Sequence, residues 1–153
     1  YIFIILIILS FTVDRYSKIE ILKLLGDKNY LFINDFLNLN LVFNTGIGFG
    51  LFSLNAGIYY NILSILIFLI ILVLIYLMLK SKTIEKIFLS FIIGGAIGNL
   101  YDRIIYKAVP DFIDFHIKDL HWFTFNIADI FISLGIILMI LNELVYNRQK
   151  NEN

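Results

Sequence analysis

The sequence contains no cysteine, and charged residues make up only 16% of its 153 positions. Without cysteine, the chain can form no disulfide, no thiolate metal site and no cysteine nucleophile. Its acidic and basic residues cancel to a formal net charge of zero. A protein that binds nucleic acid usually carries a basic excess, so this balance argues against a nucleic-acid partner.

Apolar residues, in contrast, are in excess. Hydrophobic side chains account for 60% of the chain, and its mean hydropathy is +0.89. A soluble domain of this size could not bury so much apolar surface, so the excess must face lipid. The composition therefore predicts one integral membrane domain that covers residues 1–153.

Four apolar stretches are long enough to cross a bilayer, and they predict a membrane α-helical fold. About 20 residues, at a rise of about 1.5 Å each, cover a hydrocarbon core of about 30 Å. The stretches cover about 1–25, 58–79, 87–105 and 125–146. The first lacks a small-residue cleavage site, so we expect a retained span, with a few further residues before Tyr1.

Basic residues predict the direction of the spans. They gather in the link between the second and third stretches and in the C-terminal tail: Lys80, Lys82, Lys86, Arg148 and Lys150. Segments rich in lysine and arginine stay in the cytoplasm, so both of these segments are predicted to be cytoplasmic. Four spans then place both termini inside, and the loops 26–57 and 106–124 outside.

Polar residues in three of the stretches lie at similar predicted depths. They are Asp14, Asn99, Asp102, Asn126 and Asp129. Helical rise and span direction place all of them in the outer half of the membrane. Asp14 and Lys18 are four residues apart and can pair on one helix face. Ionisable residues inside spans are costly and usually functional, so this convergence predicts a site near the outer face.

The outer loops contain two recognisable segments. Residues 36–43 alternate apolar and polar side chains, which predicts a half-buried strand. Residues 111–123 mix aromatic and charged side chains, so we expect an interfacial loop near the lipid headgroups, with Trp122 as an anchor. We expect Asp114 and Asp119 to be solvated loop charges.

The sequence offers few candidates for a nucleophile or for metal ligands. No serine lies in a Gly-x-Ser-x-Gly setting. His116 and His121 show no His-Glu-x-x-His pattern and no evident third ligand, so we expect interfacial or solvated histidines and no metal. Carboxylates remain, because two of them can share one proton and act as base and acid on a water and a carbonyl. The candidates are Asp102, Asp111, Asp114, Asp119 and Asp129.

Five motifs together resemble a known family, the lipoprotein signal peptidases or signal peptidase II, which are aspartic proteases of the bacterial inner membrane. In chain order the motifs are DRYSK at 14–18, FNTGIGFG at 43–50, GGAIGNLYDR at 94–103, VPDFID at 109–114 and FNIAD at 125–129. Each is weak alone, but all five in order and with fitting spacing are highly specific. The resemblance covers the chain from Asp14 to about Leu138.

The resemblance implies that Asp111 and Asp129 are the catalytic pair. It implies cleavage just before the lipid-modified cysteine of a diacylglyceryl-modified prolipoprotein, without metal or cofactor. Site supports and substrate contacts would be Asn44, Gly46, Asn99, Asp102, Arg103 and Asn126, with Asp14 and Lys18 stabilising the site. It also implies a small extracytoplasmic β-sheet and a short outer helix, which we place near 53–57. One chain would hold a complete site, so we expect a monomer in contact with membrane lipid.

The chain departs from the family pattern in three places. Ile47 and Gly48 stand where the family usually has two alanines, and Ser17 replaces a usual threonine. Pro110 stands where valine is common, which fixes one φ angle and removes a backbone donor beside Asp111. None of these changes removes a catalytic group.

Two other classes of protein also fit an intramembrane Asp and Lys. The first is a small ion- or proton-coupled transporter subunit. Such proteins gather polar residues near the midplane and often contain an internal repeat, whereas this sequence shows neither feature. The second is an assembly protein without catalysis, which would not need two carboxylates that converge from different segments.

Overall fold

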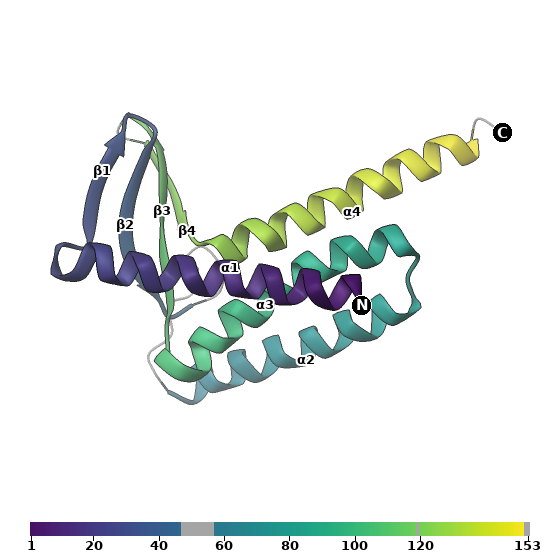
Figure 1. The fold of residues 1–153 in the computed structure, drawn as a ribbon, viewed down its shortest axis with the longest axis horizontal. Helices are drawn as coiled ribbons and strands as arrows, with labels where there is room; N and C mark the ends of the chain where they lie inside the picture. Colours follow the sequence, from purple (N-terminus) through teal and green to yellow (C-terminus); the bar gives the residue numbers. More distant parts are fainter. Residues whose placement is uncertain (47–56, 119, 152–153) are drawn as a thin grey trace.

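Four long helices run through the computed structural model, which describes residues 1–46, 57–118 and 120–151 (Figure 1). They are α1 Ile2–Leu25, α2 Ile58–Lys80, α3 Thr83–Tyr106 and α4 Ile127–Asn151, and a 3-10 turn, η1 Gly26–Lys28, follows α1. Each helix covers one of the apolar stretches that the sequence predicts. The expected outer helix near 53–57 falls almost entirely outside the described residues.

Three helices of the described chain are long and apolar enough to cross a membrane by length and composition. The qualifying segments are Tyr60–Lys80, Thr83–Tyr106 and Ile127–Tyr146. Together with the exposed apolar side chains along these helices, they indicate a multi-pass membrane protein. Helix α1 does not meet the same criterion, because charged residues interrupt it. Two of them, Asp14 and Lys18, are completely buried within the protein.

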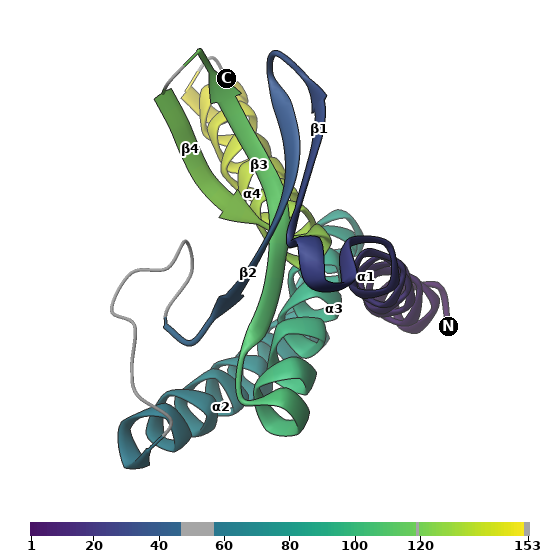
Figure 2. The ribbon, with the colours of Figure 1, turned by 90° about the vertical axis from the view of Figure 1, so that its left-hand side faces the viewer.

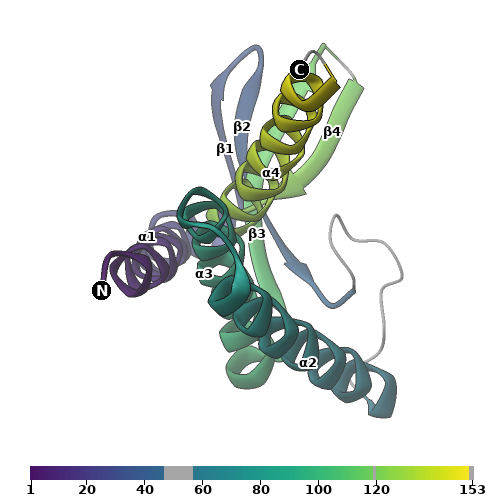
Figure 3. The same cartoon turned by 90° about the vertical axis from the view of Figure 1, so that its right-hand side faces the viewer.

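Helix α3 forms the centre of the bundle and packs against the other three helices (Figure 3). Its glycines allow two of these close approaches. A Cβ atom on Gly94 would lie 2.6 Å from Ser10 Cβ and 2.8 Å from the Ile7 carbonyl oxygen of α1. A Cβ atom on Gly95 would lie 2.5 Å from the Ala128 carbonyl oxygen of α4. Small residues at these positions therefore permit the close packing of α3 against α1 and α4.

A four-stranded antiparallel sheet stands at one end of the helices (Figures 1 and 2). The strands are β1 Tyr30–Asn34, β2 Leu37–Asn44, β3 Val109–Ile117 and β4 Leu120–Phe125, in the spatial order β1-β2-β3-β4. Strand β2 confirms the strand predicted at 36–43. Both chain ends lie toward the opposite end of the helices (Figure 1).

The expectation of an interfacial loop at 111–123 is wrong, because most of this segment forms the β3–β4 hairpin. Asp114 is 2% exposed and His116 is 7% exposed, so neither is the solvated group that we expected. Pairing with β2 explains their burial, since Asp114 lies directly opposite Asn38. Trp122 is 64% exposed, as an anchor requires. Asp119 lies outside the described residues.

The sheet is attached to the bundle by a small apolar core. Ile21 and Leu25 from the last turns of α1 pack with Leu41 of β2 and Phe112 of β3. All four side chains are buried. Burying apolar side chains of this size contributes about 1.5–3 kcal/mol each. This contact fixes β3, and with it Asp111, relative to the helices.

The glycine packing generates a stability prediction. Gly94→Ala places a methyl group against the backbone of α1, which cannot move aside as a flexible side chain would. We expect a loss of about 1–3 kcal/mol in the free energy of unfolding, the usual cost of overpacking. Unfolding in detergent would measure it. Ile104→Val, at a half-exposed position of the same helix, is the control. Equal stability of the two variants would contradict the packing argument.

Candidate active site

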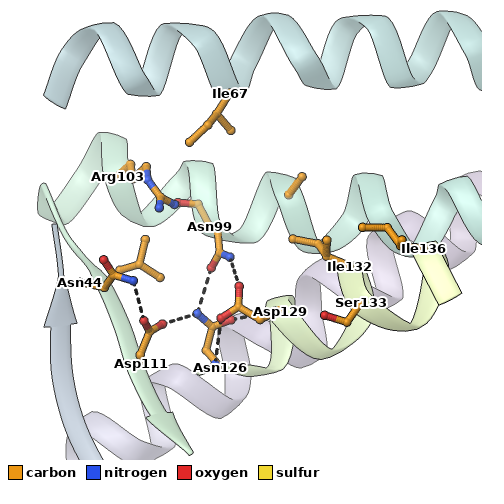
Figure 4. Close-up of a pocket in the computed structure, with 12 residues that line it drawn as sticks. Asn44, Ile67, Asn99, Arg103, Asp111, Asn126, Asp129, Ile132, Ser133 and Ile136 are labelled. Carbon is orange, nitrogen blue, oxygen red and sulfur yellow. Dashed lines mark hydrogen bonds between the residues drawn. The ribbon is translucent and has the colours of Figure 1, made fainter. Parts of the chain in front are cut away.

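A pocket of about 320 Å³ lies between α2 and α4, with α3 and the start of β3 beside it (Figure 4). One part of its lining is polar: Asn44, Asn99, Arg103, Asp111, Asn126, Asp129 and Ser133. The other part is apolar: Ile67, Ala96, Val109, Ile132 and Ile136. The pocket therefore joins a polar centre to an apolar slot between membrane-type helices.

Asp111 reaches the pocket from β3 and is only 3% exposed. Its two carboxylate oxygens accept hydrogen bonds from the side-chain amides of Asn44, at 2.8 Å, and Asn126. Pro110 precedes it without breaking the sheet, because β4 pairs with β3 only from Ile113 onward. Burial, and then the nearby charge of Asp129, raise the pKa of Asp111 to about 6 against the lowering effect of the two amides.

Asp129 enters the pocket from the first turn of α4. Its Oδ1 accepts a hydrogen bond from Asn99 Nδ2 at 2.8 Å, and its Oδ2 accepts one from the backbone N–H of Asn126 at 3.1 Å. In return, Asn126 Oδ1 accepts the backbone N–H of Asp129 at 3.1 Å. This reciprocal pair is a capping box that satisfies donors at the start of α4. Asp129 thus caps its own helix while it faces the pocket.

Asn126 connects the two carboxylates. Its Nδ2 donates to Asp111 Oδ1 and also lies 3.2 Å from Asn99 Oδ1. Because Asn99 in turn donates to Asp129, hydrogen bonds run without a break from Asp111 to Asp129 (Figure 4). Asn126 is completely buried. The side chains predicted to converge from separate segments therefore do meet.

Asp14 and Lys18 of α1 support this series of hydrogen bonds. Their predicted pairing is confirmed, since Lys18 Nζ lies 2.8 Å from Asp14 Oδ2. Asp14 Oδ1 accepts the backbone N–H of Ala128 at 2.9 Å, which ties α1 to the first turn of α4. Lys18 Nζ donates to Asn99 Oδ1 at 3.0 Å and forms an ion pair with Asp102 at 2.7 Å. Neither Asp14 nor Lys18 lines the pocket itself.

Asp102 and Arg103 are adjacent in the sequence, but they bind different partners. Asp102 forms its ion pairs with Arg15 and Lys18. Arg103 instead donates to two backbone carbonyls, those of Asn99 at 3.2 Å and Gly46 at 3.0 Å. Neighbouring residues on a helix point in different directions, so Arg103 binds the backbone beside the pocket while Asp102 faces α1.

Arg15 is a buried residue whose role was not predicted from the sequence. It pairs with Asp102 and lies 4.7 Å from the centre of the Tyr101 ring in a cation–π arrangement. A signal was available, since one lysine cannot neutralise both Asp14 and Asp102 in an apolar environment. Arg15 stands next to Asp14 in the first motif and supplies the second positive charge.

Two hydrogen bonds fix the backbone of Gly46 beside the pocket residues Asn44 and Arg103. Its backbone N–H donates to Asn44 Oδ1 at 2.9 Å, while its carbonyl accepts from Arg103. Asn44 therefore orients both Asp111 and the chain that follows β2. The departures at Ile47 and Gly48 lie outside the described residues.

This arrangement can hold a water molecule between two carboxylates and can move protons to and from it. Among the described residues, the hydrogen-bond donors to the two carboxylates are neutral amides and a backbone N–H group. Neutral donors orient a carboxylate without fixing it in the ionised form as a salt bridge would. The chemistry that fits is general acid–base catalysis by a pair of aspartates.

Comparison with known proteins identifies the family of this chain. The family described as Signal peptidase (SPase) II matches residues 6–145. The chain is 49% identical over 152 residues to the lipoprotein signal peptidase of Pelagibacter ubique, an alignment that covers 98% of this chain and 92% of that protein. It is 40% identical over 141 residues to the lipoprotein signal peptidase of Anaplasma phagocytophilum, which covers 90% and 88% of the two chains.

Solved structures show the same fold. A bacterial membrane enzyme superposes with a TM-score of 0.81 at 27% sequence identity, over 99% of this chain and 92% of that one. A second bacterial membrane enzyme structure gives a TM-score of 0.78, also at 27% identity, and covers 93% and 92% of the two chains. With the family match over most of its length and its close relatives, the chain belongs to the signal peptidase II family.

Proposed function

We propose that this chain is a membrane aspartyl endopeptidase that removes the signal peptide from diacylglyceryl-modified bacterial prolipoproteins. Its relatives are lipoprotein signal peptidases by name. The observation that carries the proposal is the pair of buried aspartates joined through Asn126 and Asn99 in one pocket. The family assignment does not favour the transporter alternative.

In the proposed mechanism, Asp111 and Asp129 hold one proton between them. The ionised carboxylate takes a proton from a water molecule, and that water attacks the carbonyl carbon before the lipidated cysteine. The protonated carboxyl donates its proton to the carbonyl oxygen, and a tetrahedral intermediate forms. Collapse of this intermediate, with proton transfer to the leaving nitrogen, breaks the peptide bond. The amides of Asn44, Asn99 and Asn126 keep both carboxylates oriented throughout.

The shape of the pocket supports a substrate that is part lipid and part peptide. Its apolar side chains, Ile67, Ile132 and Ile136, belong to helices α2 and α4 of the membrane-type bundle. Acyl chains or an apolar signal helix can lie there without leaving an apolar environment. The scissile bond would then lie at the polar end, beside the aspartates.

We further propose four spans in one domain, with α1 as the first span and both termini in the cytoplasm. Helix α1 exposes many apolar side chains, and its Asp14, Arg15 and Lys18 are buried against α3 and α4 rather than facing lipid. The sheet then lies outside, and the pocket opens near the outer face of the inner membrane. We also propose that the protein acts as a monomer, because a single chain supplies both aspartates and the amides that bind them.

Removal of either carboxylate tests the mechanism. We expect Asp111→Asn and Asp129→Asn to lower cleavage of a diacylglyceryl-modified prolipoprotein peptide by about 10²–10⁴-fold, the usual contribution of a general acid or base. The assay uses purified protein in detergent. Ser133→Ala is the matched control, since Ser133 lines the same pocket. Full activity of either Asn variant, or complete loss in Ser133→Ala, would overturn the assignment.

Single cysteines test the topology, because the chain has none of its own. Asp35→Cys lies between β1 and β2, and Lys82→Cys lies just before α3; both positions are exposed. We expect a membrane-impermeant maleimide to label Asp35→Cys in intact spheroplasts, and Lys82→Cys only after lysis. Labelling in the opposite order would reverse the proposed orientation, and labelling of both before lysis would contradict the four-span arrangement.

The raised pKa of Asp111 predicts a dependence of stability on pH. A carboxyl with a pKa of about 6 when folded and about 3.8 when unfolded binds its proton more tightly in the folded state. Its stabilising contribution is therefore complete below about pH 3.8 and is lost as the pH rises through about 6. Relative to Asp111→Asn, the wild type should lose about 3 kcal/mol of stability between pH 4 and pH 7.

Thermal unfolding in detergent at several pH values would measure this difference. Asp35→Asn, which removes an exposed carboxylate from the β1–β2 turn, should retain the pH dependence of the wild type. Parallel curves for the wild type and Asp111→Asn would show that Asp111 has no raised pKa.

A further inference from the structure

A second cluster of chemistry-bearing side chains lies on the β3–β4 hairpin, outside the pocket. It consists of Asp114 and His116 from β3 and His121 from β4, whose ligand atoms all lie within 4.8 Å of one another. Strand alternation brings Asp114 and His116 to one face of the sheet, and His121 lies directly opposite His116 in the strand register. These are the only two histidines in the chain.

The three side chains are already in close contact. His121 Nδ1 lies 2.9 Å from Asp114 Oδ2, and the two imidazole rings stack with their centres 4.9 Å apart. Asp114 and His116 are buried, while the His121 side chain is 52% exposed. Two of the groups are therefore enclosed by the protein, and the third lies at the surface, where its ring has room to turn toward an ion.

Asn38 of β2 lies behind His116. Its Nδ2 is 3.3 Å from His116 Nδ1, whereas its Oδ1 has no hydrogen-bond partner among the described residues, although the side chain is 2% exposed. If the amide turns, Asn38 Oδ1 accepts a hydrogen bond from His116 Nδ1–H, which leaves Nε2 of that ring free to bind a metal. A histidine ligand that donates its other ring N–H to a fixed acceptor is the usual arrangement at metal sites.

We propose that Asp114, His116 and His121 bind a divalent transition-metal ion, with Zn²⁺ as the best fit. Two imidazole nitrogens and one carboxylate oxygen are ligands that zinc takes at about 2.0–2.2 Å, and three protein ligands leave a fourth position for water. His116 also lines an open hollow of 510 Å³, bounded by Phe32, Phe36 and Lys118 among others, which gives water access to the cluster. The two rings now stack nearly parallel, so binding requires the exposed His121 ring to turn until both imidazoles point at the ion.

The position of the site determines what the ion would do. Strand β3 carries Asp111 three residues before Asp114, and β4 leads directly into Asn126 and α4. An ion bound by both strands would join them near the hairpin turn, where the hydrogen-bond ladder is irregular between Asp114 and His116. It would stabilise the hairpin that carries Asp111 and leads into Asn126 and α4, and it would take no part in the cleavage step.

Calorimetric titration of the purified protein with ZnCl₂ tests the proposal. The protein must carry no polyhistidine tag, and it must first be stripped with a chelator. We expect binding of one ion per chain and a raised unfolding temperature in its presence. His121→Gln should weaken binding by about tenfold or more. Excess Mg²⁺ should not displace the ion, because magnesium prefers oxygen ligands.

Two further variants make the result decisive. His116→Gln should also weaken Zn²⁺ binding by about tenfold or more, with Co²⁺ absorption as an independent measure of nitrogen coordination. Glu20→Gln removes an exposed carboxylate on α1 and should bind Zn²⁺ as the wild type does. Absence of saturable binding by a folded wild type, or equal affinity in wild type and His121→Gln, would show that the cluster is only a hydrogen-bonded His–Asp pair.

Discussion

The rest of the structure depends on the neutralisation of charges that are buried inside an apolar bundle. Asp14, Lys18 and Arg15 of α1 and Asp102 of α3 form one network in which two negative charges balance two positive ones. An isolated charge at this depth would cost several kcal/mol, and removal of one partner of such a pair typically costs about 3–5 kcal/mol. The network therefore fixes how α1 lies against α3, and the bond from Asp14 to Ala128 extends that constraint to α4.

The pocket is built on a different principle. Asn44, Asn99 and Asn126 bring neutral amide donors to the two aspartates. If lysine or arginine made these contacts, both carboxylates would be held ionised, and neither could deliver a proton. The charged residues of this network thus hold the helices together, whereas uncharged asparagine amides orient the two aspartates of the pocket. In the proposed mechanism, this division leaves the two carboxylates oriented and still able to exchange a proton.

Much of this could be predicted from the sequence because the membrane imposes simple rules. Apolar length located the four helices, and the rise per residue correctly predicted that Asn99, Asn126 and Asp129 meet. Contacts between distant segments were harder to predict. Asp102 pairs with Arg15, which is 87 residues away, and with Lys18, and nothing in local spacing connects these residues. The β3–β4 hairpin was missed because aromatic and charged residues in 111–123 suggested an exposed loop, whereas pairing with β2 buries Asp114 and His116.

The capping box at the start of α4 constrains how this enzyme family can escape an inhibitor. Asn126 caps α4, donates to Asp111 and contacts Asn99, so no single replacement alters one of these roles alone. Resistance that arises at the polar end would cost helix stability and catalysis together. The permissive positions are the apolar side chains Ile67, Ile132 and Ile136, where a change of size leaves the hydrogen bonds intact. A compound that binds only through the polar end therefore leaves few viable routes to resistance.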